Sequence, residues 1–187
     1  MYPASDASCA KGWKSLNQEI GTDPDCLLAA NPTKLASALR PGGMVAELRA
    51  MRLKEIAERI QKEFGGDLLS ALRRLSIAQM RVALKKFPNI ADPGADRILL
   101  FGGISPVAAV PSNCPHVLVR IQAGHERENY AVIYREAQRG IAAGLPATFD
   151  ARIRAYLLLK RHGQQLCKRS NPKCSACRTR WLKRCRT

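Results

Sequence analysis

The sequence contains few aromatic residues and no long hydrophobic run. Aromatic residues make up 5% of the 187 residues. This argues against a surface that stacks several bases of a single nucleic-acid strand, because such a surface needs several aromatic faces. No segment approaches the roughly eighteen consecutive apolar residues that a membrane-spanning helix requires. Residues 1–13 also lack the apolar core of a signal peptide. These absences favour a cytoplasmic protein.

Acidic residues are also scarce relative to basic ones. The chain has 31 Lys and Arg against 15 Asp and Glu, a formal net charge of +16. A positive field of this size attracts polyanions, and for a soluble protein of bacterial appearance the polyanion is usually nucleic acid. A ribosome-associated protein and a merely solvated surface are alternative interpretations. Membrane-surface binding is disfavoured because the cations are spread over the whole chain. We therefore expect a bacterial, nucleoid-associated protein.

Hydrophobic residues recur at helical spacing in four segments, and no segment alternates as a β-strand does. The apolar run 107–110 lies between two prolines, which favours a connector over a strand. The chain is therefore predicted to be all-α, with the apolar stripes in its core and poor order before Lys11. The four helical segments are 53–64, 76–87, 130–141 and 149–163.

Several helix boundaries are indicated by single residues. Ser76 and Gln79 have the spacing of a capping box, in which each side chain bonds the other's backbone N–H at a helix start. Gly65, Gly144 and Gly163 are placed where helices are predicted to end, since glycine tolerates the backbone conformations that terminate a helix.

Four of the seven cysteines are crowded at the end of the chain, in the pattern C-x6-C-x2-C-x7-C. A C-x-x-C pair brings two thiolates to one metal centre, and two flanking cysteines complete four ligands. Disulfides are disfavoured by the odd number of cysteines in a cytosolic chain. A [4Fe–4S] cluster is favoured over zinc, because structural zinc usually uses two such pairs, but zinc stays open. The four candidate ligands are Cys167, Cys174, Cys177 and Cys185. The other cysteines, interpreted as buried free thiols, are Cys9, Cys26 and Cys114.

Basic residues lie between and beside these four cysteines, and no acidic residue occurs from Cys167 onward. A loop closed by a metal centre and carrying only cations would be a rigid phosphate-binding surface. Alternatively, the cations offset thiolate charge, which would account for only some of them. They are Lys168, Arg169, Lys173, Arg178, Arg180, Lys183, Arg184 and Arg186.

A helix–turn–helix corner is predicted at residues 84–100. One helix is predicted to end at Pro88, and a second to start at Pro93, a residue that suits the first turn of a helix. The turn between them would point backbone N–H groups and a helix N-terminus outward, where they bind one phosphate without reading sequence. Taken alone, the pattern fits any helix–turn–helix corner equally well.

Taken together, these segments resemble the endonuclease III family of DNA glycosylases, within the helix-hairpin-helix base-excision repair superfamily. The sequence FPNIA at 87–91, followed by Ala95, is similar to the LPGVG hairpin of that family. The sequence VPSN at 110–113, followed by VLVRI at 117–121, is similar to the block that comes after the hairpin there.

The cysteine tail extends the resemblance. The four cysteines fall where that family binds a [4Fe–4S] cluster, although the last interval is longer here. The segment 157–167 is similar to the helix that leads into the cluster. The resemblance covers residues 44–187, is nearest to short uncharacterised bacterial members, and strengthens the preference for an iron–sulfur cluster over zinc.

The resemblance implies an all-α, two-lobed fold. Residues 1–43 would be a partly disordered N-terminal helical segment, 44–124 a helical barrel with the hairpin, and 125–187 the C-terminal helices and cluster loop. Family members have more helix before the segment matching residues 11–21, so we expect an N-terminally truncated chain whose cluster lobe lacks a packing partner. Double-stranded DNA would lie across the cleft with one nucleotide flipped out. A monomer would bind it, largely independently of sequence. The DNA-binding residues implied are Asn89, Ile90, Ala91, Gly94, Arg178, Arg180 and Lys183.

The positions that carry catalysis in that family hold prolines here. The lysine nucleophile matches Pro93, so AP-lyase activity is not expected. The carboxylate that stabilises charge on the sugar matches Pro111. The turn glycine matches Ala91, where a left-handed alanine would cost on the order of 1 kcal/mol. Asp92 is expected to cap the second hairpin helix, and Asp96 to face solvent or to pair with a nearby cation.

No other residue is assigned to catalysis, and the catalytic residues stay unknown. His116 and His125 are interpreted as surface residues. Ser112 and Asn113 could orient a water molecule but supply no negative charge. The chain is thus either a glycosylase whose active site uses other groups or a catalytically silent DNA-binding relative. A basic zinc-binding module unrelated to repair is the third and weakest interpretation.

Overall fold

The structure is a computed structural model that describes residues 5–123 and 129–178. Every regular element in these ranges is a helix, so the predicted all-α class is confirmed. None of the helices in the described part of the chain is both long and apolar enough to cross a membrane. The chain divides into two compact units, residues 1–75 and 76–187, and each is described by itself below. The predicted domain borders after residues 43 and 124 stay a prediction.

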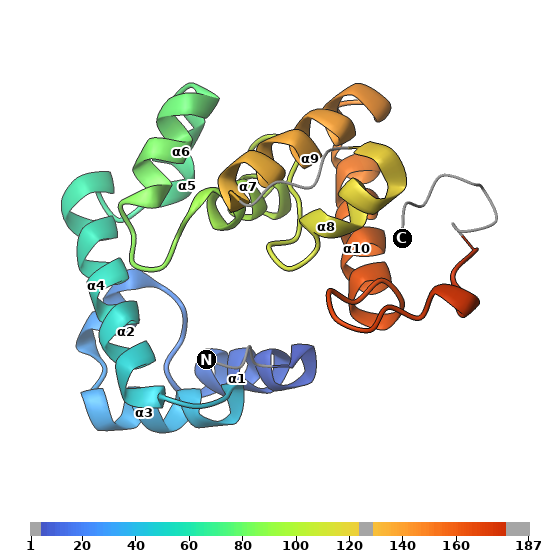
Figure 1. Cartoon of the computed structure of the whole chain (residues 1–187). Coiled ribbons are helices and arrows are strands. Elements are labelled where there is room, and N and C mark those ends of the chain that lie inside the picture. Colours follow the sequence, from blue (N-terminus) through green and yellow to red (C-terminus); the bar gives the residue numbers. More distant parts are fainter. Residues whose placement is uncertain (1–4, 124–128, 179–187) are drawn as a thin grey trace. The chain divides into compact units, whose positions relative to one another are not determined.

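The first unit consists of short helices joined by short loops and one longer helix, α4 (Figure 1). Side-chain caps begin three of them. Ser5 accepts the N–H of Ser8 at 3.1 Å, Asn31 accepts that of Thr33 at 2.9 Å, and Asp67 accepts that of Ser70 at 2.9 Å. Gly65 ends α4 with a left-handed φ of 61°, as predicted. The helices are α1 (Asp6–Glu19), α2 (Pro24–Ala29), α3 (Pro32–Leu39), η1 (Arg40–Gly42), α4 (Ala46–Phe64) and α5 (Leu68–Arg73).

The core of this unit is formed by leucines and alanines of α1 to α4, including Leu16, Leu35 and Ala57. Helix α1 starts at Asp6, so residues 6–10 are helical, whereas the sequence predicts poor order before Lys11. The Arg49 guanidinium of α4 donates to the carbonyls of Leu39 at 2.6 Å and Gly43 at 2.7 Å. These bonds fix the end of α3 and the following loop against α4.

The second unit contains the predicted hairpin and the helices that follow it. The predicted capping box at its start is confirmed, because Ser76 and Gln79 exchange bonds between side chain and backbone. Asn129 caps α9 and Thr148 caps α10. No strand forms at 107–110. The elements are α6 (Ile77–Lys85), α7 (Asp92–Phe101), α8 (Pro115–Leu118), η2 (Val119–Ala123), α9 (Tyr130–Gly144), α10 (Phe149–Gln165) and η3 (Cys174–Ala176).

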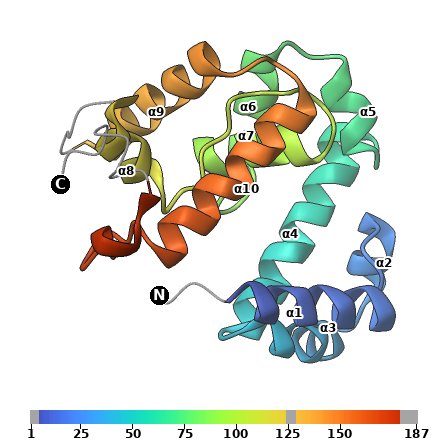
Figure 2. The same ribbon diagram turned by 90° about the vertical axis from the view of Figure 1, so that its right-hand side faces the viewer.

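Helix α10 packs against both α7 and α8, and Figure 2 shows it running past α7. Its predicted end at Gly163 is wrong, because the helix continues to Gln165. Gly163 is instead a packing residue: a Cβ there would lie 2.5 Å from the sulfur of Cys114. The absence of a side chain at Gly163 thus lets α10 approach the loop that carries Cys114. Of the predicted stripe on α9, Tyr134, Ala137 and Ile141 are buried, whereas Tyr130 is 40% exposed.

Candidate nucleic-acid interface

The hairpin forms where the sequence predicts it, with small differences at its boundaries. Helix α6 ends at Lys85 instead of Pro88, and α7 begins at Asp92 with Pro93 in its first turn. Phe87 is buried, 3% exposed, and anchors the turn between the two helices. The hairpin residues predicted to contact DNA therefore lie together, in this turn and in the first turn of α7.

The backbone of the turn differs from the expectation at Ala91. Ala91 is extended, with φ −102°, and not left-handed. The left-handed residue is Asn89, with φ 61°. Asparagine adopts this conformation more readily than other residues with a Cβ, because its short polar side chain bonds locally. The prediction of a strained, left-handed Ala91 is therefore wrong, and the turn closes without glycine.

The first turn of α7 presents backbone N–H groups beside an exposed ion pair. Ala95 donates the first intrahelical bond, to the carbonyl of Ala91 at 2.9 Å, so the N–H groups of Asp92 and Gly94 precede the helical ladder. Asp92 is not the N-cap as predicted. That position belongs to Ala91, which has no capping side chain. The Asp92 carboxylate instead pairs with Lys85 at 2.8 Å, which offsets its negative charge at a helix end suited to an anion.

Asp96 is the residue whose environment the sequence predicts least well. It is buried, only 1% exposed, and does not face solvent. Its carboxylate accepts hydrogen bonds from Arg81 at 2.6 Å, from the Tyr134 hydroxyl at 2.9 Å and from Gln138 at 2.6 Å. The expected pairing with a nearby cation is thus present, but inside the protein. Because three donors surround it, this carboxylate is not open to a substrate.

The Asp96 network connects the hairpin to the rest of the second unit. Arg81 lies on α6, and Tyr134 and Gln138 lie on α9. Gln138 also donates to the carbonyl of Ala108 at 3.1 Å, in the segment that leads to Pro111. Burial, followed by the charge and hydrogen bond of Asp96, raises the pKa of Tyr134 far above its usual range, so its hydroxyl stays a donor.

The loop after Pro111 exposes two polar side chains. Pro111 is buried, and its carbonyl accepts the N–H of Cys114 at 2.9 Å. Ser112 and Asn113 are exposed. The Tyr130 hydroxyl donates to the Ser112 carbonyl at 3.1 Å, which attaches the loop to the start of α9. The side chain at position 111, where the resemblance places a carboxylate, supplies no charge.

The cysteine loop is held by His116 and Arg120, which precede it by some fifty residues. Nε2 of His116 lies 2.7 Å from the carbonyl of Cys167, so His116 packs against the loop and is not the surface residue expected. Burial is the main cause that lowers the pKa of His116, which favours the neutral ring. Arg120 donates to the carbonyls of Lys168 at 2.8 Å and Arg169 at 3.1 Å. It also lies 3.5 Å from the Cys167 sulfur.

The described part of the chain includes three of the four predicted metal ligands. Cys167 and Cys177 are buried, Cys174 is partly exposed, and none of the three forms a disulfide. Cys185 and His125 lie outside the described residues. Within those residues, no group of three or more His, Cys, Asp or Glu side chains is placed to hold a metal ion. The metal centre stays a prediction.

The remaining cysteines do not all behave as expected. Cys114 is buried, and burial followed by its neighbour Cys167 raises the pKa of its thiol. Cys9 and Cys26 are exposed, so their predicted burial is wrong. Cys9 lies on α1 and Cys26 on α2, and neither belongs to the buried cluster that these helices form.

The cations near the cysteines are exposed wherever the structure describes them. Lys168, Arg169, Lys173 and Arg178 all face solvent. The predicted DNA-binding residues Arg180 and Lys183 lie outside the described residues, as do Arg184 and Arg186.

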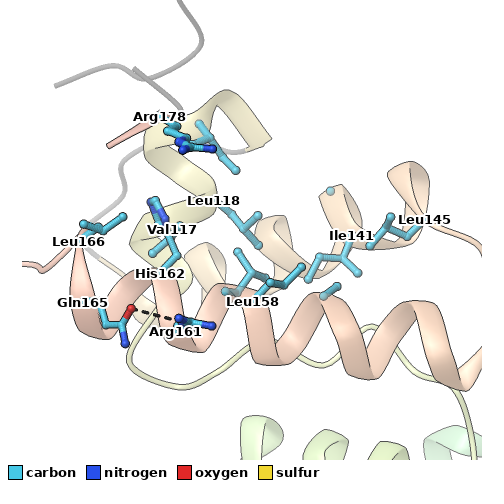
Figure 3. Close-up of a pocket in the computed structure, with 14 residues that line it drawn as sticks. Val117, Leu118, Ile141, Leu145, Leu158, Arg161, His162, Gln165, Leu166 and Arg178 are labelled. Atoms are coloured by element: carbon cyan, nitrogen blue, oxygen red, sulfur yellow. Dashed lines mark hydrogen bonds between the residues drawn. The ribbon is translucent and has the colours of Figure 1, made fainter. Parts of the chain in front are cut away.

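A cavity of about 870 Å³ lies between α8, α9 and α10, away from the residues of the hairpin (Figure 3). Its walls are mostly apolar, with Leu118, Ile141 and Leu158 pointing into it. Arg161 and Gln165, joined by a hydrogen bond of 3.3 Å, form part of its rim. Because neither the hairpin nor the Ser112–Asn113 loop lines it, this cavity is not the place where the resemblance puts the catalytic chemistry.

Comparison with known proteins identifies the fold. Neither a family model nor a curated protein matches the sequence. A solved complex of endonuclease III with DNA is 18% identical, with a TM-score of 0.73 over 98% of this chain and 77% of that chain. A thermostable thymine-DNA glycosylase is 18% identical, with a TM-score of 0.75 over the same shares.

A third solved structure has a lower structural similarity to this chain. The 3-methyladenine DNA glycosylase MagIII of H. pylori, bound to 1,N6-ethenoadenine, is 20% identical with a TM-score of 0.59, over 86% of this chain and 76% of that chain. The chain therefore has the fold of the helix-hairpin-helix DNA glycosylases, as the resemblance implies.

Replacing Asp96 with asparagine tests whether its network holds the second unit together. The amide of Asp96→Asn would turn an N–H group toward the donors and leave Arg81 without a carboxylate. We expect the free energy of unfolding to fall by about 2–4 kcal/mol. Asp92→Asn is the matched control, because it removes an exposed ion pair worth about 0–1 kcal/mol. Urea unfolding followed by circular dichroism measures both, and equal small losses would contradict the role given to Asp96.

Proposed function

We propose that this chain is a DNA-binding protein of base-excision repair that grips duplex DNA through the hairpin and removes bases poorly or not at all. The observation that carries the proposal is the turn of the hairpin. It is closed by a left-handed Asn89 and followed by the N-terminus of α7, within a DNA-glycosylase fold. The described partners of the solved neighbours, DNA and a modified adenine, support the same partner class.

The hairpin presents backbone N–H groups that can bind a phosphate. The N–H groups of Asp92 and Gly94 come before the first helical hydrogen bond, at the positive end of the α7 dipole. An anion at a helix N-terminus gains both the hydrogen bonds and the dipole interaction. Such contacts go to phosphate oxygens and carry no sequence information. We therefore propose that a monomer binds double-stranded DNA with little sequence preference.

Exposed Lys and Arg side chains add to the proposed binding of DNA. The net charge of +16 and the exposed Lys168, Arg169, Lys173 and Arg178 support an electrostatic contribution from the cysteine loop. Each phosphate that a Lys or Arg neutralises releases counterions, which makes the affinity depend on salt. We propose that Arg180 and Lys183 add to this surface, and that the protein is found on the bacterial nucleoid.

The absence of the family's reactive groups is the reason for proposing weak catalysis. Pro93 and Pro111 supply neither an amine nucleophile nor a carboxylate. Asp92 is engaged by Lys85, and Asp96 is enclosed by three donors. Neither carboxylate replaces the missing charge next to a sugar. A glycosylase that uses other groups is the competing possibility, and a measurement of base excision distinguishes the two.

Binding of fluorescently labelled duplex DNA tests the proposal. If about six phosphates are contacted, the affinity should fall about a thousandfold between roughly 50 and 200 mM salt. Arg178→Glu should weaken binding and flatten this dependence. An affinity for duplex DNA that does not change with salt would contradict the electrostatic grip.

A pair of variants at Gly94 tests the hairpin within the same assay. A Cβ at Gly94 would make only ordinary contact with Ile90, at 3.4 Å, so a side chain fits there. Gly94→Glu places a negative charge where the phosphate is proposed to lie and should weaken binding about tenfold or more. Gly94→Gln has the same size without the charge and should bind nearly as the parent does. Equal losses in the two variants would mean that the helix N-terminus does not meet a phosphate.

We also propose that Cys167, Cys174, Cys177 and Cys185 hold a [4Fe–4S] cluster. The chemistry of the donor set fits such a group. It comprises four thiols, of which Cys167 and Cys177 are buried, and the cations around them balance the charge of an anionic cluster. When bound, the cluster would cross-link the loop that carries these cations. Arg120 already lies 3.5 Å from the Cys167 sulfur and ties the loop to η2.

Absorbance and metal analysis of protein purified without oxygen test the cluster. We expect a brown protein with a broad absorbance near about 400 nm and about four iron atoms per chain. Cys174→Ser should lose both signals, whereas Cys26→Ser, in the first unit, should keep them. A colourless protein with one zinc per chain would contradict the cluster and favour the zinc-binding alternative.

A further inference from the structure

The cavity between α8, α9 and α10 leaves apolar side chains open to solvent. Its volume is about 870 Å³, and of the leucines that line it Leu158 is 57% exposed and Leu145 is 37% exposed. Contiguous apolar surface is unfavourable in water, and in soluble proteins it marks a place where other apolar groups bind. Pockets of about 300–1,000 Å³ take drug-sized molecules, so this cavity has room for two large side chains together.

One end of the cavity lies where the cysteine loop meets α10. Figure 3 shows Arg178 at this end and Leu145 at the other. Nε2 of His162, another residue that lines the cavity, lies 3.7 Å from the sulfur of Cys177. The chain therefore continues beyond Arg178 directly from the rim of the cavity.

The sequence that follows contains an adjacent pair of large apolar residues, Trp181 and Leu182. They belong to the segment 179–187, TRWLKRCRT, which lies outside the described residues. A basic residue flanks the pair on each side, and long basic side chains reach water from the edge of an apolar site. Three residues span up to roughly 10 Å, so Trp181 is within reach of a cavity that begins at Arg178.

We propose that Trp181 and Leu182 of this chain occupy the cavity and cover its apolar walls. Because the occupant belongs to the same chain and starts at the rim, its effective concentration at the cavity is high. The flanking basic side chains stay in water. This docking goes beyond the proposed binding of DNA and gives the segment 179–187 a packing role of its own.

The docking is compatible with the proposed metal centre. Trp181 is the middle one of the seven residues between Cys177 and Cys185. The chain can therefore leave the first of these cysteines, place its apolar pair in the cavity and return to the second. Fixing both cysteines in one centre would lower the entropy that the docking costs, because the ends of the loop are then already held.

Labelling with an indole-selective alkylating reagent, read by mass spectrometry of peptides, tests the docking on the full chain purified without oxygen. The chain has two tryptophans, and Trp13, which is 62% exposed on α1, is the internal control. If the pair is docked in about nine of ten molecules, Trp181 should be labelled about tenfold more slowly than Trp13. Equal rates for the two tryptophans would overturn the docking.

Two variants of α10 show whether the protection comes from the cavity. Leu158→Gln places a polar side chain in the cavity and should raise the labelling rate of Trp181 severalfold, because an apolar contact is lost. Leu157→Gln is the matched control, since Leu157 is 51% exposed on the same helix and is not among the residues that line the cavity. It should leave Trp181 protected.

A reciprocal measurement follows the cavity itself. Trp181→Ser should uncover the apolar walls, so a fluorescent dye that binds exposed apolar surface should bind this variant more strongly than the parent. Trp13→Ser removes the other tryptophan and should leave dye binding unchanged. Equal dye binding by the parent and Trp181→Ser would contradict the docking.

Each remaining outcome also overturns it. A Trp181 that stays protected in Leu158→Gln is covered by another part of the protein, and equal exposure in Leu157→Gln and Leu158→Gln shows a general loosening of α10. Protection that grows with protein concentration shows that the segment binds the cavity of a second copy. None of these measurements involves DNA, so failure of the docking leaves the proposed function intact.

Discussion

A single carboxylate, that of Asp96, lies buried where α6, α7 and α9 meet, and the arrangement of the second unit depends on it. A buried charge is unfavourable unless hydrogen bonds replace the lost water. Here Arg81, Tyr134 and Gln138 provide those bonds at 2.6 to 2.9 Å. Because the donors come from different helices, the carboxylate fixes the hairpin relative to α9. Through Gln138 and Ala108, it also fixes the segment that leads to Pro111.

This network links the hairpin to the loop that follows Pro111. On one side of the network, the hairpin turn presents backbone N–H groups at the start of α7. On the other, Tyr134 supports Tyr130 beside the exposed Ser112–Asn113 loop. Within this unit, Pro93 and Pro111 occupy the positions where the resemblance places an amine and a carboxylate.

The local features of the fold follow from the sequence because neighbouring residues determine them. The capping box at Ser76, the end of α4 at Gly65 and the hairpin between Phe87 and Pro93 each depend on a few consecutive residues. The burial of Asp96 does not, because Tyr134 and Gln138 follow it by about forty residues. Spacing within one helix gives no information on such partners. The exposure of Tyr130 does not follow from the sequence for a related reason. Helical periodicity assigns a residue to the buried face of a helix, but it does not show whether the core extends to the end of that helix, where Tyr130 lies.

The hairpin turn shows that a backbone conformation cannot be transferred from a matched position of the family. Matching Ala91 to a glycine of the family carries over a left-handed conformation, but in this chain Asn89 takes that conformation and Ala91 is extended. The hairpin therefore needs no glycine, and the departure at Ala91 is no sign that the phosphate grip is lost. The departures at Pro93 and Pro111 are of another kind, since no change in backbone conformation supplies an amine or a carboxylate.

We propose that the protein binds duplex DNA without excising bases, and single-turnover kinetics test this most directly. Excess protein would be bound to duplexes carrying oxidised pyrimidines or mismatches, and released base would be measured for the parent and for Pro111→Asp. We expect the parent to bind these duplexes but to release no base above background. A carboxylate at position 111 should raise the rate of base release by up to a factor of roughly a thousand. Efficient excision by the parent chain, unaffected by changes at Ser112, Asp92 and Asp96, would contradict the claim.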